Sequence, residues 1–150
     1  MNDDSLIDLA WQAREQAYAP YSKFKVGAAV LTTNGMTFPG CNMENLSYGL
    51  TLCAERVALG SMVAAGHRSL LAIAVVADTS EPISPCGACR QVLAEFGDCR
   101  LILVARAGVV FHATLSILFP RAKVGILDFP AADVPRGTTG DDTPEARQLT

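Results

Sequence analysis

Three cysteines are the residues of this chain best suited to binding a metal ion. Residues 53–55 read Cys-Ala-Glu, and residues 85–89 read Pro-Cys-Gly-Ala-Cys. Three thiolates can hold Zn²⁺ and leave its fourth tetrahedral position open, which is the arrangement of a catalytic zinc site. The pattern therefore predicts a zinc ion bound by Cys53, Cys86 and Cys89.

Two charged residues follow the first cysteine, and each suits a role beside such an ion. Glu55 stands two positions after Cys53, so on a helix it does not face the same way and is better placed beside the open position, as a catalytic proton carrier, than as a ligand. Three thiolates on Zn²⁺ carry a net negative charge that weakens the metal as a Lewis acid. We expect the Arg56 guanidinium to hydrogen-bond the thiolates and restore that acidity; the alternative is an ordinary surface charge.

Other interpretations of the cysteines stay open at this point. A thioredoxin-type redox pair would use Cys86 and Cys89 and leave Cys53 without a role. A structural zinc site would need a fourth protein ligand, since such sites are closed. The candidates for that ligand are Cys41, Cys99, His67 and His112. We expect the two cysteines to be small buried residues and the two histidines to be non-catalytic.

Composition limits the class of protein and the kind of partner. The chain has 150 residues, half of them hydrophobic, which indicates a single globular domain. Its formal charge is −3 and no Lys/Arg cluster is visible, which argues against a nucleic acid polymer and favours a small uncharged substrate. The longest apolar run, residues 70–77, is too short to span a membrane. The acidic start lacks the features of a signal peptide, so we expect a cytoplasmic protein without disulfides.

Both cysteine segments are predicted to begin helices, over residues 51–65 and 86–96. The positive end of a helix dipole stabilises a thiolate and lowers its pKa, which favours metal binding. An earlier helix is predicted to start with Ser5 as its cap and to end near Tyr18, ahead of Pro20.

The strands are predicted from apolar runs and turn signals. Residues 24–33 and 36–41 should form a hairpin around a two-residue turn of Asn34 and Gly35. Residues 70–77 should be a strand buried on both faces. Residues 100–105 and 109–112 complete the set, and residues 114–119 form a short helix.

The order of these elements predicts an α/β fold, a three-layer α-β-α sandwich with a mixed five-stranded sheet. Residues 1–130 are expected to form one catalytic domain. From residue 131 the composition shifts to glycine, threonine, proline and charge, so residues 131–150 are expected to be a disordered tail.

The motifs together resemble a known family. Residues 53–55 and 85–91 are similar to the signature of the zinc deaminases, in its three-cysteine form. Residues 20–29 (PYSKFKVGAA) and 40–45 (GCNMEN) resemble two further segments of the short cytidine deaminases. The resemblance implies the cytidine deaminase-like fold, one zinc ion per subunit and the hydrolytic conversion of cytidine and deoxycytidine to uridine and deoxyuridine in pyrimidine salvage.

The resemblance also implies roles for single residues. Cys53, Cys86 and Cys89 would ligate zinc, and an activated water would attack C4 of the base. Glu55 would take the water proton, deliver it to ring N3 and later help to protonate the departing ammonia. Four residues would bind the substrate. Asn42 and Glu44 would hold the ribose hydroxyls, Phe24 would pack on the pyrimidine, and the Ala54 N–H would donate to the base O2.

Members of this short class usually form homotetramers, often with an aromatic residue of one subunit completing the site of another, so the resemblance implies a homotetramer. Lys123 stands where the family has that aromatic, so either Phe129 or Phe119 replaces it or the contact is missing. The alternative function is deamination of another aminopyrimidine nucleoside, such as blasticidin S, and a structural zinc module is a third hypothesis.

Overall fold

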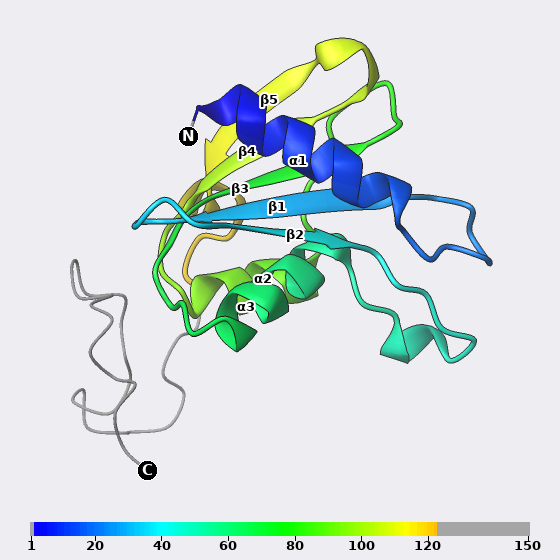
Figure 1. Cartoon of the computed structure of the whole chain (residues 1–150), viewed down its shortest axis with the longest axis horizontal. Helices are drawn as coiled ribbons and strands as arrows, with labels where there is room; N and C mark the ends of the chain where they lie inside the picture. The colour runs from blue at the N-terminus through cyan, green and yellow to red at the C-terminus, as the bar shows by residue number, and fades with distance from the viewer. Residues whose placement is uncertain (1, 123–150) are drawn as a thin grey trace.

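The computed structural model describes residues 2–122 as one mixed five-stranded sheet covered by helices on both faces (Figure 1). The strand order is β2-β1-β3-β4-β5, and within it β3 and β4 run parallel while the other neighbours are antiparallel. The elements in chain order are α1 (Asp3–Glu15), β1 (Val26–Thr32), β2 (Thr37–Cys41), the 3₁₀ turn η1 (Tyr48–Leu50), α2 (Ala54–Ala64), β3 (Leu70–Ala77), α3 (Gly87–Ala94), β4 (Arg100–Val104), the 3₁₀ turn η2 (Arg106–Gly108), β5 (Val110–Thr114) and α4 (Leu115–Leu118). The predicted fold class and element order are confirmed.

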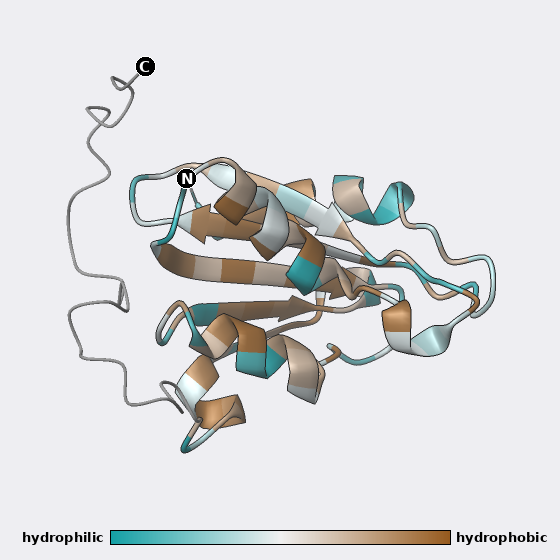
Figure 2. Ribbon diagram, turned by 90° about the horizontal axis from the view of Figure 1, so that it is seen from below, coloured by the Kyte–Doolittle hydropathy of each residue, from teal (hydrophilic) through white to brown (hydrophobic). Residues whose placement is uncertain are grey.

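Each face of the sheet carries its own hydrophobic core, because alternate side chains of a strand point to opposite faces. On one face α1 packs through Leu6 and Ala10. On the other face α2 and α3 pack through Leu59 and Leu93. The strands are apolar along most of their length in Figure 2, as expected for a sheet covered on both sides.

Two glycines let the helices approach the sheet at backbone distance. A Cβ on Gly27 would lie 2.0 Å from the carbonyl oxygen of Ala10 in α1. A Cβ on Gly40 would lie 2.3 Å from the backbone nitrogen of Ala58 and 2.6 Å from the carbonyl oxygen of Ala54, both in α2. The position of α2, and with it the cysteine at its start, is therefore fixed against the backbone of β2.

Helix α1 differs from its prediction at both ends. Ser5 is not the cap; the side chain of Asn2 caps the helix by accepting from the Ser5 N–H at 3.0 Å. The helix ends at Glu15 rather than near Tyr18. The Tyr18 N–H donates to the Asn42 carbonyl at 3.0 Å, so this long-range bridge takes the backbone group that a longer helix would have used.

The hairpin between β1 and β2 also differs, since its loop has three residues, 33–35, rather than two. The Thr32 N–H donates to the Met36 carbonyl at 2.9 Å, and the Gly35 N–H donates to the Thr32 carbonyl at 3.0 Å. Gly35 has φ +87°, the left-handed conformation that closes a loop of this length. The Thr32 hydroxyl accepts from the Met36 N–H at 2.9 Å and stabilises the longer loop.

Helix α2 begins at Ala54, three residues later than predicted. Leu52 forms an isolated bridge with Met43, which keeps the residues before the helix extended. The other predicted boundaries differ by at most two residues, and β3 has the predicted bounds. Lys123, Phe129 and the predicted tail 131–150 lie outside the described residues. Among the helices of residues 2–122, none combines the length and the apolar character needed to cross a membrane.

Candidate active site

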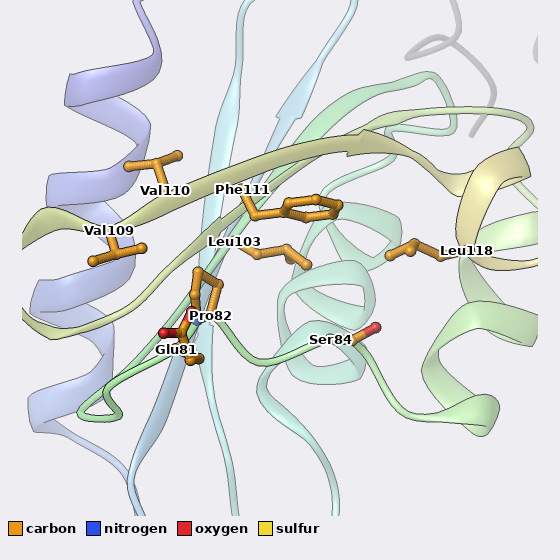
Figure 3. Close-up of a pocket in the computed structure, with 8 residues that line it drawn as sticks. All are labelled: Glu81, Pro82, Ser84, Leu103, Val109, Val110, Phe111 and Leu118. Carbon is orange, nitrogen blue, oxygen red and sulfur yellow. The ribbon is translucent and has the colours of Figure 1, made fainter.

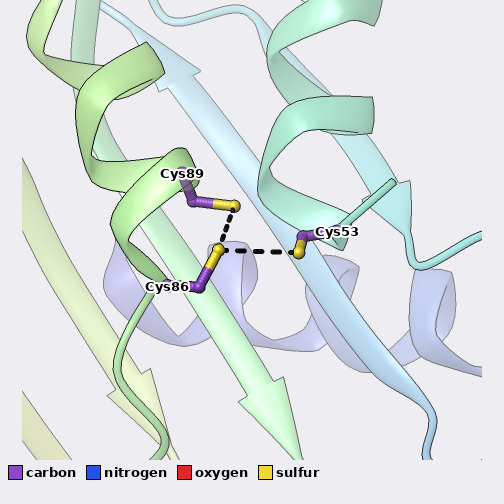
Figure 4. A group of neighbouring side chains, drawn as sticks. All are labelled: Cys53, Cys86 and Cys89. Atoms are coloured by element: carbon purple, nitrogen blue, oxygen red, sulfur yellow. Dashed lines mark hydrogen bonds between the residues drawn. The ribbon is translucent and has the colours of Figure 1, made fainter. Parts of the chain in front are cut away.

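The starts of α2 and α3 lie side by side and bring the three predicted ligand sulfurs together (Figure 4). Cys53 caps α2, Cys86 caps α3, and Cys89 lies in the first turn of α3. The Sγ atom of Cys86 lies 3.8 Å from that of Cys53 and 3.6 Å from that of Cys89. All three sulfurs lie within 4.8 Å of one another.

This arrangement weighs on the alternatives left open by the sequence. The Cys53 sulfur lies about as near the Cys86 sulfur as the Cys89 sulfur does. The three sulfurs therefore form one cluster, rather than a redox pair with an unrelated third cysteine. Within residues 2–122 the cluster contains no further His, Cys, Asp or Glu. The described part of the chain therefore supplies three ligands and not the fourth that a closed structural site needs. Cys99 is buried, as expected, and Cys41 is partly buried.

The protonation of the sulfurs shows what kind of group fits among them. Hydrogen bonding from the Cys89 thiol, together with Arg56, lowers the pKa of Cys53 to about 5. The pKa of Cys89 is raised, chiefly because it donates to the Cys53 sulfur and also because it is buried. One thiolate thus suppresses ionisation of its neighbour, and a divalent cation reduces that penalty by offsetting two of the three negative charges. The donor set fits a zinc ion.

Arg56 lies where the sequence predicted a compensating charge. Its Nη2 atom is 3.8 Å from the Cys53 sulfur and donates to the Thr51 carbonyl at 2.8 Å. Its Nε is buried and has no hydrogen-bond partner in the structure. A half-buried guanidinium with an unused Nε–H beside thiols suits an anionic cluster such as a zinc ion with three thiolates. Hydrogen bonding to Cys53 raises the pKa of Arg56, so the charge is permanent.

Glu55 is a buried acid next to this cluster. Its side chain is 4% exposed. Burial is the main cause that raises the pKa of its carboxyl, and the neighbouring Cys53 charge adds to the effect. Its carboxylate is not part of the group of three sulfurs, in line with a role beside the metal rather than on it.

A second set of polar groups lies around Glu44. This residue follows Met43, which forms a bridge with Leu52, the residue before Cys53. Glu44 accepts from the Tyr21 N–H at 2.9 Å and the Ser22 N–H at 3.2 Å, and also from the Ser22 hydroxyl. The hydroxyl bond is the main cause that lowers the pKa of Glu44. The carboxylate is therefore ionised and held in one place. It lines a cavity of about 400 Å³ together with Tyr21, Ser22, Asn45, Tyr48 and Thr51.

The Asn42 side chain is used mainly by the protein itself. Its Oδ1 accepts from the Val26 N–H at 2.8 Å, and its Nδ2 donates to the Phe24 carbonyl at 2.9 Å. An amide has a second N–H and a second lone pair, so one of each remains for another partner. Sequence reasoning missed this structural role because the partners lie 16 and 18 residues away.

The last two predicted substrate residues differ in exposure. Phe24 is 41% exposed, with its backbone fixed on both sides by Asn42 and the Ser22 hydroxyl. Ala54 is buried and is the first residue of α2, so its N–H belongs to those that a helix leaves without an intrahelical acceptor. Phe119, one of the two candidates to replace the family aromatic, packs against the core beside α2 and α3.

Two residues near the site were not singled out by the sequence. Ser22 positions Glu44, and Arg90 holds the loop that leads into Cys86. Both lie inside the quoted motifs. No local signal shows their partners, since Ser22 meets Glu44 from 22 residues away and Arg90 meets Leu118 from 28 residues away.

Comparisons with known proteins agree with this geometry. The family model described as the cytidine and deoxycytidylate deaminase zinc-binding region matches residues 1–105. A cytidine deaminase of Sporosarcina psychrophila is 51% identical over 124 residues, covering 81% of this chain and 91% of that protein. One of Halalkalibacterium halodurans is 52% identical, covering 81% and 94%.

Solved structures give the same result. The crystal structure of cytidine deaminase from Burkholderia pseudomallei matches with a TM-score of 0.80 at 52% identity, covering 82% of this chain and 100% of that one. The structure of cytidine deaminase from Mycobacterium tuberculosis matches with a TM-score of 0.69 at 42% identity, covering 81% and 97%.

Proposed function

This chain belongs to the cytidine and deoxycytidylate deaminase family, and from that premise we propose that it hydrolyses cytidine and deoxycytidine to uridine and deoxyuridine with release of ammonia. The observation that carries the proposal is the trio of sulfurs at two helix starts with a buried glutamate beside it. Cys53, Cys86 and Cys89 would hold a zinc ion, and its Lewis acidity would activate the water that attacks C4 of the base.

Glu55 carries the protons of this reaction. Its carboxylate takes a proton from the attacking water and delivers it to ring N3. It then takes the proton of the new C4 hydroxyl and delivers it to the amino group, so that C4=O forms as the C4–N bond breaks and ammonia leaves. Burial of Glu55 supports this role, because a carboxyl group shielded from bulk solvent passes its proton to the substrate rather than to water. The exposed ring of Phe24 would pack on the base, and the Ala54 N–H would donate to the base O2.

Glu44 and Asn42 bind the sugar in this proposal. The Glu44 carboxylate is ionised and lines the cavity, so it can accept from ribose hydroxyls. One N–H of the Asn42 amide donates to the Phe24 carbonyl, and the second N–H would donate to a ribose hydroxyl. A fixed negative charge at this position also repels a 5′-phosphate, which favours nucleosides over nucleotides.

Deamination of another aminopyrimidine nucleoside, such as blasticidin S, is the alternative substrate choice. A substrate without ribose hydroxyls would give Glu44 no hydrogen bond beyond those it accepts from Tyr21 and Ser22. The test is the ultraviolet spectral change of cytidine, deoxycytidine, free cytosine and blasticidin S on incubation with the purified protein. We expect turnover of the two nucleosides; turnover of blasticidin S alone would replace the main proposal, and turnover of none would remove both.

A homotetramer in the cytoplasm completes the proposal. Large apolar side chains near the cavity are exposed in the single chain, and such a surface is typical of one covered by another subunit. They are Tyr18, Tyr21, Phe24, Met43, Leu46, Tyr48 and Leu50. All five cysteines are free, which suits a reducing compartment. Light scattering on the purified protein tests the oligomer, and a monomeric mass would contradict it.

A further inference from the structure

The side chain of Arg90, a residue of α3, ties the loop before this helix and the last residue of α4 to the helix itself. Its Nε donates to the Pro85 carbonyl at 2.7 Å, its Nη2 to the Ser84 hydroxyl at 2.7 Å, and its Nη1 to the Leu118 carbonyl at 2.6 Å. The first two acceptors belong to the loop that enters α3, and the third is the last residue of α4. The planar guanidinium presents its donors in a fixed fork, so these three regions are held in a fixed relation.

These contacts surround Cys86. The Pro85 carbonyl belongs to the peptide that enters Cys86, and the Cys86 carbonyl accepts from the backbone N–H of Arg90 at 3.0 Å. Arg90 therefore anchors the peptides on both sides of the Cys86 Cα. Cys86 itself is exposed, whereas Cys89 is buried. Packing fixes Cys89, but the direction of the Cys86 side chain depends on hydrogen bonds to its backbone.

Arg90 differs from Arg56, which occupies a similar place at the start of α2. Arg56 donates to the Thr51 carbonyl and also reaches the Cys53 sulfur. The side-chain contacts of Arg90 within the described residues are all to oxygen atoms. Arg56 thus acts on the charge of the sulfur cluster, while Arg90 acts on its geometry.

The third contact connects Arg90 to the last residue of α4. Ser84 and Leu118 line a cavity of about 350 Å³ between the loop before α3 and β5, and Figure 3 shows their side chains there with Phe111. Arg90 joins the segments on which both residues lie. Arg90 therefore connects the end of α4 to the loop that leads into Cys86.

We propose that Arg90 is a positioning residue for the metal ligand Cys86, which it aims at the other two sulfurs by holding the backbone on either side and bracing it against the end of α4. The proposal rests on zinc being bound by the three sulfurs. It does not depend on which substrate is turned over, because its test measures zinc and not catalysis.

The experiment compares zinc release from the zinc-loaded protein into an excess of the chromophoric chelator 4-(2-pyridylazo)resorcinol. We expect Arg90→Gln to release zinc roughly tenfold faster or more, the usual size of an effect from a group that orients a ligand. Arg90→Lys keeps the charge and can satisfy one carbonyl, so its rate should lie between. Cobalt-loaded Arg90→Gln should also show a weaker thiolate-to-cobalt charge-transfer band, which a merely structural role would leave unchanged.

The matched control is Arg68→Gln. Arg68 is exposed, donates to the Val63 and His67 carbonyls at 2.9 and 2.8 Å, and lies beyond the opposite end of α2. Its loss should leave zinc release unchanged. Equal release from wild type and Arg90→Gln overturns the proposal, as does equal acceleration by Arg68→Gln. If Arg90→Gln does not fold, Arg90→Lys and Ser84→Ala decide, and unchanged release from both also overturns it.

Discussion

The Nη2 atom of Arg56 lies 3.8 Å from the Sγ atom of Cys53, so a permanent positive charge faces a cluster that three thiolates make negative. The same atom donates to the Thr51 carbonyl, which fixes the guanidinium in place. Arg56 offsets the charge of the sulfur cluster and is held in place by its bond to Thr51. Its substitution should therefore affect catalysis more than folding.

We expect Arg56→Gln to retain zinc but to lower kcat about 10- to 100-fold, because the uncompensated thiolates leave the metal a weaker Lewis acid. Arg56→Lys keeps the charge without the planar fork, so its kcat should lie between those of the glutamine variant and wild type. The measurement is kcat on cytidine with zinc content determined on the same sample. A glutamine variant with full zinc and unchanged kcat would show that the charge has no catalytic part.

Glu55→Gln should lower kcat by about 10²- to 10⁴-fold, the usual contribution of a general acid and base, while zinc remains bound. The amide has nearly the same shape as the carboxyl, so the buried site keeps its packing. Glu95→Gln is the control, since Glu95 caps the exposed end of α3 and should keep wild-type activity. Substantial turnover by Glu55→Gln would contradict the proton-transfer mechanism.

Gly40→Ala and Gly60→Ala should change stability in opposite directions. A Cβ on Gly40 would meet the backbone of α2, which cannot move aside, so we expect a loss of about 1–3 kcal/mol in the free energy of unfolding. Gly60 lies in α2 with nothing within 4 Å of its would-be Cβ, so alanine should add about 0.5–1 kcal/mol. Urea unfolding measures both, and a neutral Gly40→Ala would mean that α2 can shift freely.

The Ser22 hydroxyl lowers the pKa of Glu44, and this makes a pH dependence predictable. A carboxyl whose folded pKa is depressed stabilises the fold above its unfolded pKa and loses that contribution as the pH falls through the folded pKa. Ser22→Ala should therefore be less stable than wild type at neutral pH, and the difference should shrink in acid.

Urea unfolding of wild type and Ser22→Ala from about pH 7 to about pH 3 measures this change. Ser61→Ala is the control, because the Ser61 hydroxyl donates to the Val57 carbonyl at 3.1 Å and involves no acid. Its effect on stability should be the same at every pH. A pH-independent difference for Ser22→Ala would mean that the hydroxyl acts independently of the Glu44 charge.

The metal cluster was predictable from the sequence because its information is local. A cysteine before a helix, or two cysteines three residues apart at the start of one, occupy fixed positions once the helix forms. The prediction that Glu55 stands beside the trio rather than within it follows from helix geometry in the same way. The buried central strand was equally clear from its continuous apolar run.

Features set by a distant partner, or by a choice between neighbouring polar side chains, were not predictable. Nothing near Asn42 shows that its amide would be taken by the backbone at Phe24 and Val26. Ser5 was a reasonable cap by residue type. In the structure the cap is Asn2, three residues earlier, whose side chain accepts from the Ser5 N–H. The hairpin loop is one residue longer than predicted, and in this longer loop the Met36 N–H donates to the Thr32 hydroxyl.

The separation of Cys53 and Cys86 has a consequence for folding as well as for chemistry. They lie 33 residues apart, and the intervening chain includes all of β3, the central strand. An ion that joins them links two helix starts across the central strand, and because it binds the folded chain it stabilises that state as free zinc rises above the dissociation constant. The cell's zinc supply would thus govern how much of this protein is folded, and not only how fast it works.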